Sequence, residues 1–349
     1  MTLLAPYDKA EVSFRLDKEI GQEGANSKTY IAHDEQLDAE IVIKKVPHSG
    51  VGSVDQYFEE SRILYMSAHP NVVQVYYACK DASHIYIAMP YYRRGSLNTL
   101  MNARFLTVRE IVTLGCQIAA GLHNIHSKRL VHFDIKPDNV LLSDRGEALV
   151  SDFGLSRRTS TSGKAEQDRL YFKMCPPEAY KSIEHDARFD VYQLGLTLYR
   201  MCAGNAEFYR QFNTFGSSGS FDLNAFKVAV RNGQFPDRSK LPEHIPARLR
   251  TVVTGCLHDD LAQRTQAAIE VANGLAQVDE KLDWKYSLSS TGLREWVRFE
   301  GEMEYRIAVA SDGSSYAQKG KTGGKLSRIT SYCSSSITSA SLKKFLKET

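Results

Sequence analysis

The spacing of apolar and polar residues divides most of the chain into a strand-rich part and a helix-rich part. Residues 12–90 alternate in short apolar runs, among them AEIVIKKV and HIYIAMPY, which is typical of β-strands. One helix is expected between these runs, because Ser53 and Gln56 can form a capping box ahead of further apolar residues. From Thr107 onward the spacing becomes helical instead.

Three helical segments are predicted in the second part. Thr107 and Glu110 form another capping box, and apolar residues then recur at intervals of three and four up to Ile125. Similar spacing covers 190–203 and the region 246–276. Strands that precede helices in this way indicate an α+β fold.

The last segment, from about residue 283, differs from both parts. LREWVRFE and EYRIAVASDGSSYAQ are predicted strands, with Asp312 and Gly313 as a hairpin turn. KGKTGGK is a basic turn, and the final residues are expected to end in a short helix. The pattern predicts a small C-terminal α/β appendage.

Charge is concentrated in this appendage. Residues 281–349 hold 12 Lys or Arg and 7 Asp or Glu, a net charge of +5 in a chain whose total is +3. Two interpretations stay open. Trp284, Trp296 and Phe299 can pack against the helical part, or the basic segment can recognise an acidic partner or nucleic acid.

Cysteine spacing and hydropathy exclude several classes of protein. Six cysteines are scattered without a CxxC pair or a nearby histidine cluster, which argues against zinc and against a disulfide framework. The N-terminus lacks the pattern of a signal peptide, and no apolar run reaches the roughly 18–20 residues of a membrane helix. We therefore expect reduced thiols, a cytoplasmic location and no membrane partner.

Four residues in two short stretches carry candidate chemistry. In HFDIKPDN, Asp134 can accept a proton from an attacking hydroxyl, and Lys136 can neutralise a transferred phosphoryl group. Asn139, together with Asp152 of LVSDFGLS, offers the hard oxygen ligands that suit Mg²⁺ rather than zinc.

Three earlier elements complete the pattern. IGQEGANSKTY is a turn with small residues that let backbone amides approach phosphates, Lys44 lies late in a strand, and Glu60 lies on the following helix. Each element alone has an ordinary interpretation: a hairpin turn, a solvated lysine and a charge on a wet helix face. Five elements in this order favour one site.

The chain resembles a eukaryotic-type (Hanks-type) Ser/Thr protein kinase over about residues 12–275, specifically a soluble bacterial member with an extra C-terminal basic segment. The segments HPNVVQVYY, IAMPYYRRGSL and CPPEAY are similar to the family's segments, and Glu178 would pair with Arg264 of HDDLAQRT. The resemblance implies a bilobal fold, with a β-rich N-lobe and one regulatory helix at 12–90, a helical C-lobe at 91–280, and the appendage at 281–349.

The resemblance also implies ATP- and Mg²⁺-dependent transfer of the γ-phosphoryl group to protein Ser/Thr hydroxyls, with Mn²⁺ as an alternative ion. Lys44, braced by Glu60, would hold the α- and β-phosphates, and Asn139 and Asp152 would hold the metal. The residues expected around the nucleotide are Ile20, Gly21, Gly24, Ser27, Val42, Lys44, Met89, Pro90, Tyr92 and Leu141. Two other functions stay open: a pseudokinase that acts as a scaffold or binding module, and a small-molecule phosphotransferase.

The sequence departs from the family's pattern at several positions. The glycine loop is irregular, and Val42 stands where alanine is usual. Phe133 replaces the arginine that commonly binds a phosphate on the activation loop, so switching by that route is not expected. Tyr171 replaces the usual threonine, although Lys136 still favours a Ser/Thr acceptor over tyrosine.

Four consecutive hydroxyl residues, Thr159, Ser160, Thr161 and Ser162, follow Arg157 and Arg158. One interpretation is a solvated loop. The other is autophosphorylation, in which the new charge would pair with Arg157, Arg158 or Arg169.

Overall fold

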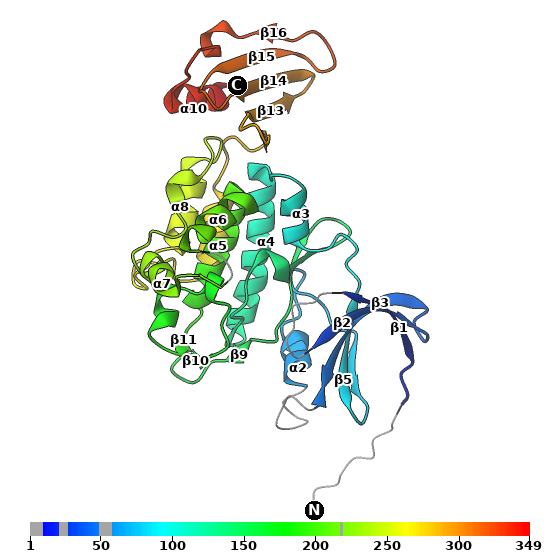
Figure 1. Cartoon of the computed structure of the whole chain (residues 1–349). Coiled ribbons are helices and arrows are strands. Elements are labelled where there is room, and N and C mark those ends of the chain that lie inside the picture. Colours follow the sequence, from blue (N-terminus) through cyan, green and yellow to red (C-terminus); the bar gives the residue numbers. More distant parts are fainter. Residues whose placement is uncertain (1–9, 21–26, 49–57, 217–218) are drawn as a thin grey trace, which may run out of the picture. The chain divides into compact units, whose positions relative to one another are not determined.

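The structure is a computed structural model that describes residues 10–20, 27–48, 58–216 and 219–349, except for the side chains of residues 59 and 60. The chain forms two compact units, Met1–Arg93 and Arg94–Thr349 (Figure 1). The first is built on a β-sheet and the second on helices followed by a C-terminal sheet. The predicted order of strands before helices is confirmed.

An antiparallel sheet of five strands forms the first unit, in the order β1–β2–β3–β5–β4. One face of the sheet buries Ala32, Ile41, Ile43 and Ala88. Helix α2 begins after Phe58, whereas the predicted capping box of Ser53 and Gln56 lies outside the described residues. The elements are β1 (Phe14–Ile20), β2 (Lys28–Asp34), β3 (Ala39–Pro47), α2 (Glu59–Met66), β4 (Tyr77–Lys80) and β5 (His84–Pro90).

Helices dominate the next part of the chain, which begins the second unit. Helix α4 starts at the predicted capping box, in which the Thr107 side chain accepts from Glu110 N and the Glu110 carboxylate accepts from Thr107 N. Helix α5 is buried along nearly its whole length. The helices are α3 (Leu97–Ala103), α4 (Val108–Ser127), α5 (Arg188–Ala203), α6 (Asn205–Phe212), α7 (Leu223–Arg231), α8 (Ala247–Cys256) and α9 (Ala268–Ala276).

A glycine sets the spacing between α5 and α8. A Cβ atom on Gly195 would lie 2.6 Å from the Cβ of Cys256, closer than two such atoms can approach. The two helices can therefore pack at this distance only because residue 195 has no side chain.

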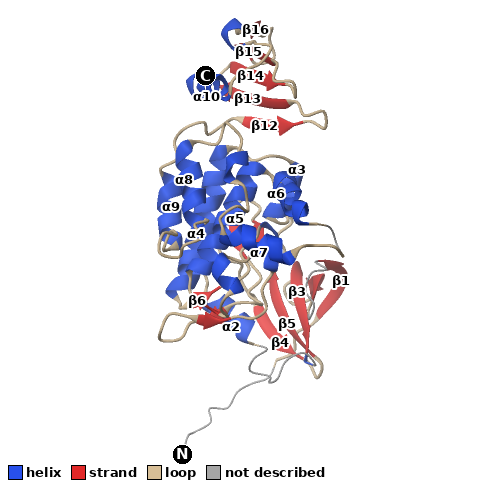
Figure 2. Ribbon diagram, turned by 60° about the vertical axis from the view of Figure 1, so that its left-hand side comes forward, coloured by secondary structure: helices blue, strands red, loops and turns tan. Residues whose placement is uncertain are grey.

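The C-terminal segment folds into strands and a final helix as predicted, although the turn expected at residues 319–325 begins only after Lys321, where the preceding strand ends. Five antiparallel strands lie in sequence order, and Asp312 and Gly313 form the turn between β14 and β15 (Figure 2). Helix α10 covers one face, where Trp284, Trp296 and Phe345 are fully buried. The elements are β12 (Lys285–Leu288), β13 (Arg294–Glu300), β14 (Met303–Val309), β15 (Ser315–Lys321), β16 (Ser327–Arg328) and α10 (Ser339–Glu348).

Polar contacts join this appendage to the turn that precedes α8 in the same unit. The Trp296 indole donates to His244 Nδ1 at 3.0 Å, and Arg294 pairs with Glu243 at 2.8 Å. Burial lowers the pKa of His244 to about 3, so the ring is neutral and can accept this bond. Trp296 thus contacts the helical part of the unit as expected, whereas Trp284 packs on the appendage's own Phe345 and Leu346 and Phe299 is 43 % exposed, so the expectation is wrong for these two residues.

The strand geometry explains this difference. Successive side chains of a strand alternate between its faces, so residues 296 and 299 of β13 point to opposite sides of the sheet. All six cysteines are free, as expected. Within the described ranges, no helix is long and apolar enough to cross a membrane.

Candidate active site

One face of the first unit's sheet collects four of the ten residues expected around the nucleotide. Val42 pairs with Met89 across β3 and β5, and Lys44 pairs with Thr29 of β2, which in turn lies opposite Ile20. Directly opposite residues of an antiparallel pair point to the same face. Val42, Lys44, Met89 and Ile20 therefore share the face opposite the Ala32 cluster.

Part of the expected nucleotide site is not described. Gly21 and Gly24 lie outside the described residues, and Ser27 is half-buried just before β2. Glu60 lies on α2, but its side chain is not described. Pro90 ends β5, and Tyr92 follows it in the same unit.

In the second unit, the first turns of α5 hold the loop that contains Asp134. The Asp190 carboxylate is fully buried and accepts hydrogen bonds from the backbone N–H groups of His132 and Phe133, both at 2.8 Å. The Gln193 side chain accepts from Ile135 N at 2.9 Å and donates to the Phe133 carbonyl at 3.1 Å. These bonds fix the loop backbone on both sides of Phe133.

Phe133 has an unusual backbone conformation, with φ at +67°. This region is strained for a bulky side chain, and such strain persists only where the surroundings enforce it. Asp190 and Gln193 supply that enforcement here.

Asp134, Lys136 and Asn139 form one hydrogen-bonded cluster. Asp134 Oδ2 accepts from Lys136 Nζ at 3.0 Å and from Asn139 Nδ2 at 2.7 Å. Asp134 Oδ1 is buried and accepts no hydrogen bond from any described residue. One carboxylate oxygen is therefore held by the protein while the other keeps its accepting capacity.

Lys136 remains a cation in this cluster. Burial opposes its charge, but the Asp134 carboxylate outweighs burial through its charge and hydrogen bond, so the pKa of Lys136 lies above its ordinary value. Its ammonium also lies 4.8 Å from the centre of the Tyr171 ring. A cation on a ring face is attracted by the ring's quadrupole.

A short hairpin brings Asn139 and Asp152 to the same end. Strands β7 (Val140–Leu142) and β8 (Ala148–Val150) pair with Val140 opposite Val150, and Ser151 N donates to the Asn139 carbonyl at 2.9 Å. Asp152 follows directly with φ at +59°. Leu141, the remaining residue expected near adenine, is half-buried in β7.

The donor set fits a divalent hard cation. Asn139 Nδ2 donates to two oxygens of Asp134, so its amide oxygen points elsewhere and accepts from no described residue. Mg²⁺ is commonly held by one or two protein oxygens, with phosphates and waters as its other ligands. No group of three or more His, Cys, Asp or Glu residues that could hold a metal occurs within the described ranges.

Phe133 anchors the segment that follows Asp152. Its fully buried ring packs with Val131, Phe189 and Ala165, and Leu155 and Leu170 border the same cluster. Ala165 also lies in the short strand β10 (Ala165–Glu166), which pairs with β11 (Glu184–His185). An apolar contact thus occupies the place where the resemblance led us to expect an arginine.

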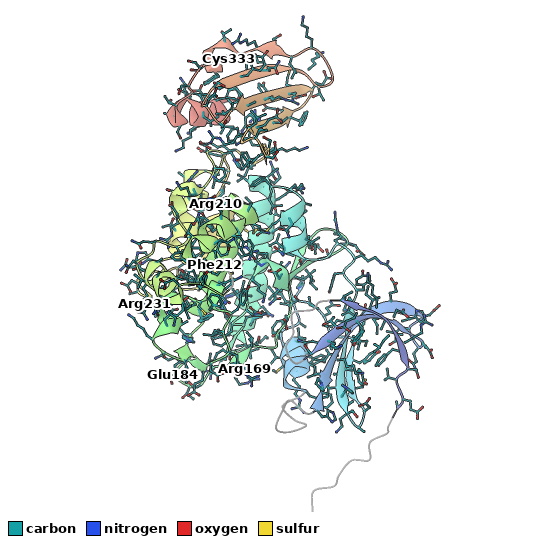
Figure 3. All side chains as sticks on the ribbon, viewed as in Figure 1. Arg169, Glu184, Arg210, Phe212, Arg231 and Cys333 are labelled. Atoms are coloured by element: carbon teal, nitrogen blue, oxygen red, sulfur yellow. The ribbon has the colours of Figure 1, made fainter. Side chains whose placement is uncertain are left out.

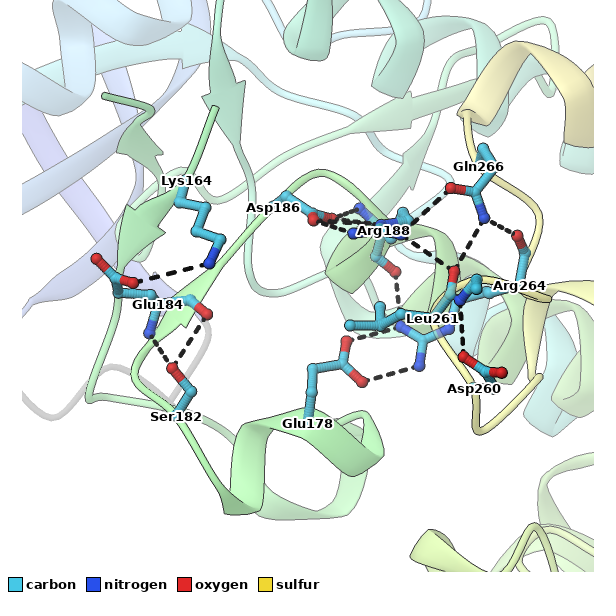
Figure 4. Close-up of polar contacts among 11 residues, drawn as sticks. Lys164, Glu178, Ser182, Glu184, Asp186, Arg188, Asp260, Leu261, Arg264 and Gln266 are labelled. Atoms are coloured by element: carbon cyan, nitrogen blue, oxygen red, sulfur yellow. Dashed lines mark hydrogen bonds and ion pairs between the residues drawn. The ribbon is translucent and has the colours of Figure 1, made fainter. Parts of the chain in front are cut away.

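The predicted pair of Glu178 and Arg264 is confirmed. Arg264 donates to both Glu178 oxygens, at 2.7 and 2.8 Å, and its side chain is fully buried (Figure 4). The same guanidinium donates to the carbonyls of His258 and Arg188. This network fixes the end of the segment to the helical core.

The hydroxyl residues of this segment differ in accessibility. Thr159 is half-buried and its hydroxyl donates to the Arg129 carbonyl at 3.3 Å, whereas Ser160, Thr161 and Ser162 are exposed. Autophosphorylation stays a prediction, for which these three residues are the accessible candidates.

Sequence reasoning missed two supporting residues. Gln193 lies three positions after Asp190, one helical turn away, and this spacing was the available signal that both face the loop. Tyr171 stood out as an unusual residue, but nothing in the sequence indicated that its ring contacts Lys136.

Comparison with known proteins agrees with this geometry. The family model for the protein kinase domain matches residues 14–273. The chain is 29 % identical over 195 residues to "Serine/threonine-protein kinase Aurora-1" of Arabidopsis thaliana, which covers 55 % of this chain and 65 % of the relative. A probable serine/threonine-protein kinase of Clostridium acetobutylicum is 25 % identical over 274 residues, or 76 % of this chain and 40 % of the relative.

An inactive serine/threonine-protein kinase of Mus musculus is also similar, at 26 % identity over 261 residues, 72 % of this chain and 40 % of the relative. The alignments span less than two thirds of the length of these three relatives. The family match covers most of the chain, which therefore belongs to the protein kinase family.

Proposed function

We propose that the chain is an ATP- and Mg²⁺-dependent kinase that phosphorylates Ser/Thr hydroxyls of proteins. The arrangement of Asp134 carries this proposal, because its Oδ2 is held by Lys136 and Asn139 while its buried Oδ1 has no partner among the described residues. An oxygen in this state is suited to accept the proton of a substrate hydroxyl. Lys136, which stays positively charged, is placed to stabilise negative charge on the transferred group.

The nucleotide is proposed to bind along the sheet face that carries Lys44. The adenine ring would lie against Ile20, Val42 and Leu141, with backbone hydrogen bonds at Pro90 and Tyr92 and with Met89 beside it. Lys44, braced by Glu60, would hold the phosphates, and the backbone at Gly21, Gly24 and Ser27 would cover them. Asn139 and Asp152 would hold Mg²⁺, or Mn²⁺ in its place, which neutralises phosphate charge when bound.

The activity is proposed not to depend on binding of an activation-loop phosphate by residue 133. The buried ring of Phe133 already belongs to one apolar cluster with Ala165, which Leu155 and Leu170 of the segment after Asp152 border. Apolar packing of this kind is present without any added charge.

The best test compares phosphoryl transfer from ATP to a generic protein acceptor by the unchanged chain and by Asp134→Asn. Loss of the proton acceptor should lower the rate by roughly 100-fold or more, the range expected for general base catalysis. Asp144→Asn is the matched control, since it removes the same charge from an exposed turn. If the unchanged chain transfers nothing to protein or to itself, the pseudokinase scaffold is the better explanation.

We also propose that the appendage binds an acidic partner, nucleic acid among them. On the sheet face away from α10, Phe299 and Tyr316 are exposed, and Lys285 and Arg328 lie 5.3 and 5.4 Å from the centres of their rings. Exposed rings can stack on nucleic-acid bases, and neighbouring cations can bind the phosphates of the backbone. Binding of a fluorescent oligonucleotide should weaken steeply with salt, and no binding at low salt would reject nucleic acid as the partner.

A further inference from the structure

Lys173 lies in the segment between Asp152 and Glu178 and is held by aromatic rings. Its ammonium lies 5.8 Å from the centre of the Tyr171 ring, 5.7 Å from Tyr209 and 4.7 Å from Phe212, which is labelled in Figure 3. Rings attract a cation and restrict its position without neutralising its charge. No carboxylate of the described residues forms an ion pair with Lys173.

Two more cations lie on the same rings. Lys136 lies on the Tyr171 ring, and the Arg200 guanidinium lies 5.4 Å from the centre of the Tyr209 ring. Arg200 is 2 % exposed and donates to the amide oxygens of Asn205 and Asn98, so within the described structure its charge is not paired with a carboxylate.

The acidic groups around these rings are mostly occupied. Asp134 accepts from Lys136, and Glu207 of α6 accepts from Arg210 and Gln211. Asp138 raises the pKa of Lys136 and acts in the same direction on Arg200, so it offsets part of the positive charge. Lys173, Lys136, Arg200 and Arg210 are thus four cations around the rings, against the three carboxylates of Asp134, Asp138 and Glu207.

The shared ring limits how far Lys173 can lie from the reaction. Lys136 and Lys173 lie 4.8 and 5.8 Å from the centre of the Tyr171 ring, so their ammonium groups are at most about 11 Å apart. Lys136 itself lies 3.0 Å from Asp134 Oδ2. An extended peptide covers about 3.3 Å per residue, so Lys173 is within reach of a side chain one to four residues from an acceptor bound at Asp134.

We propose that Lys173, on its platform of aromatic rings, is a subsite for an anionic side chain of the protein substrate, close in sequence to the phosphorylated residue. The side chain bound there would carry a carboxylate or a phosphate group, since both present negatively charged oxygens to the ammonium of Lys173. Tyr171 and Phe172 are 40 % and 38 % exposed and provide an apolar border, which strengthens a charge pair by reducing its hydration. This inference rests on the proposed kinase activity.

The test measures kcat/KM for peptides built on one neutral sequence with a single serine acceptor. Asp, Glu or phosphoserine is placed in turn at each of the four positions on either side, with Ala and Lys as references. We expect anionic residues at one or two positions to raise kcat/KM about three- to tenfold over Ala, and added salt to reduce this preference. A preference for phosphoserine alone would identify a previously phosphorylated substrate.

Charge reversal separates recognition from loss of folding. Lys173→Glu should reverse the order of kcat/KM among the peptides, so that Lys at the selected position is favoured over Asp. A misfolded variant cannot produce such a reversal. Lys128→Glu is the control, because it makes the same change at the exposed end of α4, and it should keep the acidic preference.

Two results would overturn the subsite: phosphorylation of the peptides without any anionic preference, or an acidic preference that survives in Lys173→Glu. If the unchanged chain phosphorylates neither the peptides, nor protein acceptors, nor itself, the proposed kinase activity fails as well. The two failures are thus distinguished by whether transfer occurs at all.

Discussion

The buried pair of Glu178 and Arg264 allows a quantitative prediction. In Glu178→Ala, the guanidinium of Arg264 keeps its bonds to two backbone carbonyls but loses both hydrogen bonds to a carboxylate. Removing one partner of a buried ion pair costs about 3–5 kcal/mol of unfolding free energy. The Glu178 side chain is 18 % exposed, so water reaches the pair and we expect a value near the lower limit, ~3 kcal/mol.

The measurement is equilibrium unfolding in urea, followed on the transition of the helical unit, since a chain of two units need not unfold in one step. The control is Glu184→Ala, which removes an exposed carboxylate 3.9 Å from Lys164 and should cost at most about 1 kcal/mol. The double variant Glu178→Leu with Arg264→Met should be more stable than Glu178→Leu alone, because it leaves no unpaired charge. Equal losses of unfolding free energy in Glu178→Ala and Glu184→Ala would refute this reasoning. So would a loss in the double variant that equals the sum of the losses in Glu178→Leu and Arg264→Met.

Three further predictions concern stability and modification. Burial lowers the pKa of His244 to about 3 in the folded chain, against about 6.5 in the unfolded chain, so protonation of this group should lower the unfolding free energy as pH drops below about 6.5, by up to ~1.4 kcal/mol per pH unit. In urea titrations at several pH values, the unfolding free energy of His244→Gln should therefore depend less steeply on pH. Phe133→Ala should lower the unfolding free energy by about 3–5 kcal/mol, because a fully buried ring is removed. A decrease below ~1 kcal/mol in thermal and urea unfolding would contradict this packing. After incubation with ATP, mass spectrometry should find phosphate on residues 160–162 before Thr159, whose hydroxyl is bonded to a carbonyl; an unmodified loop in a chain that labels its substrate would reject autophosphorylation there.

Local signals predicted the parts of the fold that are determined by neighbouring residues. Thr107 and Glu110 marked the start of α4 because a capping box satisfies two backbone N–H groups within one turn. Asp312 and Gly313 marked the turn between β14 and β15, where Gly313 has a φ of +85°. The spacing of Asp134, Lys136 and Asn139 also sufficed, since the three residues lie within six positions and form one hydrogen-bonded cluster.

Contacts between distant segments could not be predicted in this way. Asp190 binds the backbone of a loop nearly sixty residues earlier, and the Trp296 indole meets His244 across 52 residues. Neither contact follows from hydropathy period or turn chemistry, since each depends on how whole elements pack. Tyr171 shows the same limit: its ring contacts two lysines, Lys136 and Lys173, only because its segment folds back on the loop that contains Asp134.

The bond between Trp296 and His244 has a consequence for the length of chain that folds as one unit. Similarity to the kinase family stops at residue 273, yet the helical unit continues through the last strand and helix. A fragment cut at the family boundary would hydrate a histidine that is fully enclosed in the whole chain, and would remove the carboxylate of Asp283 that binds Arg109. The region that matches the family, residues 14–273, is therefore shorter than the region that folds together, which extends to Thr349. Expression and crystallisation should use the longer region.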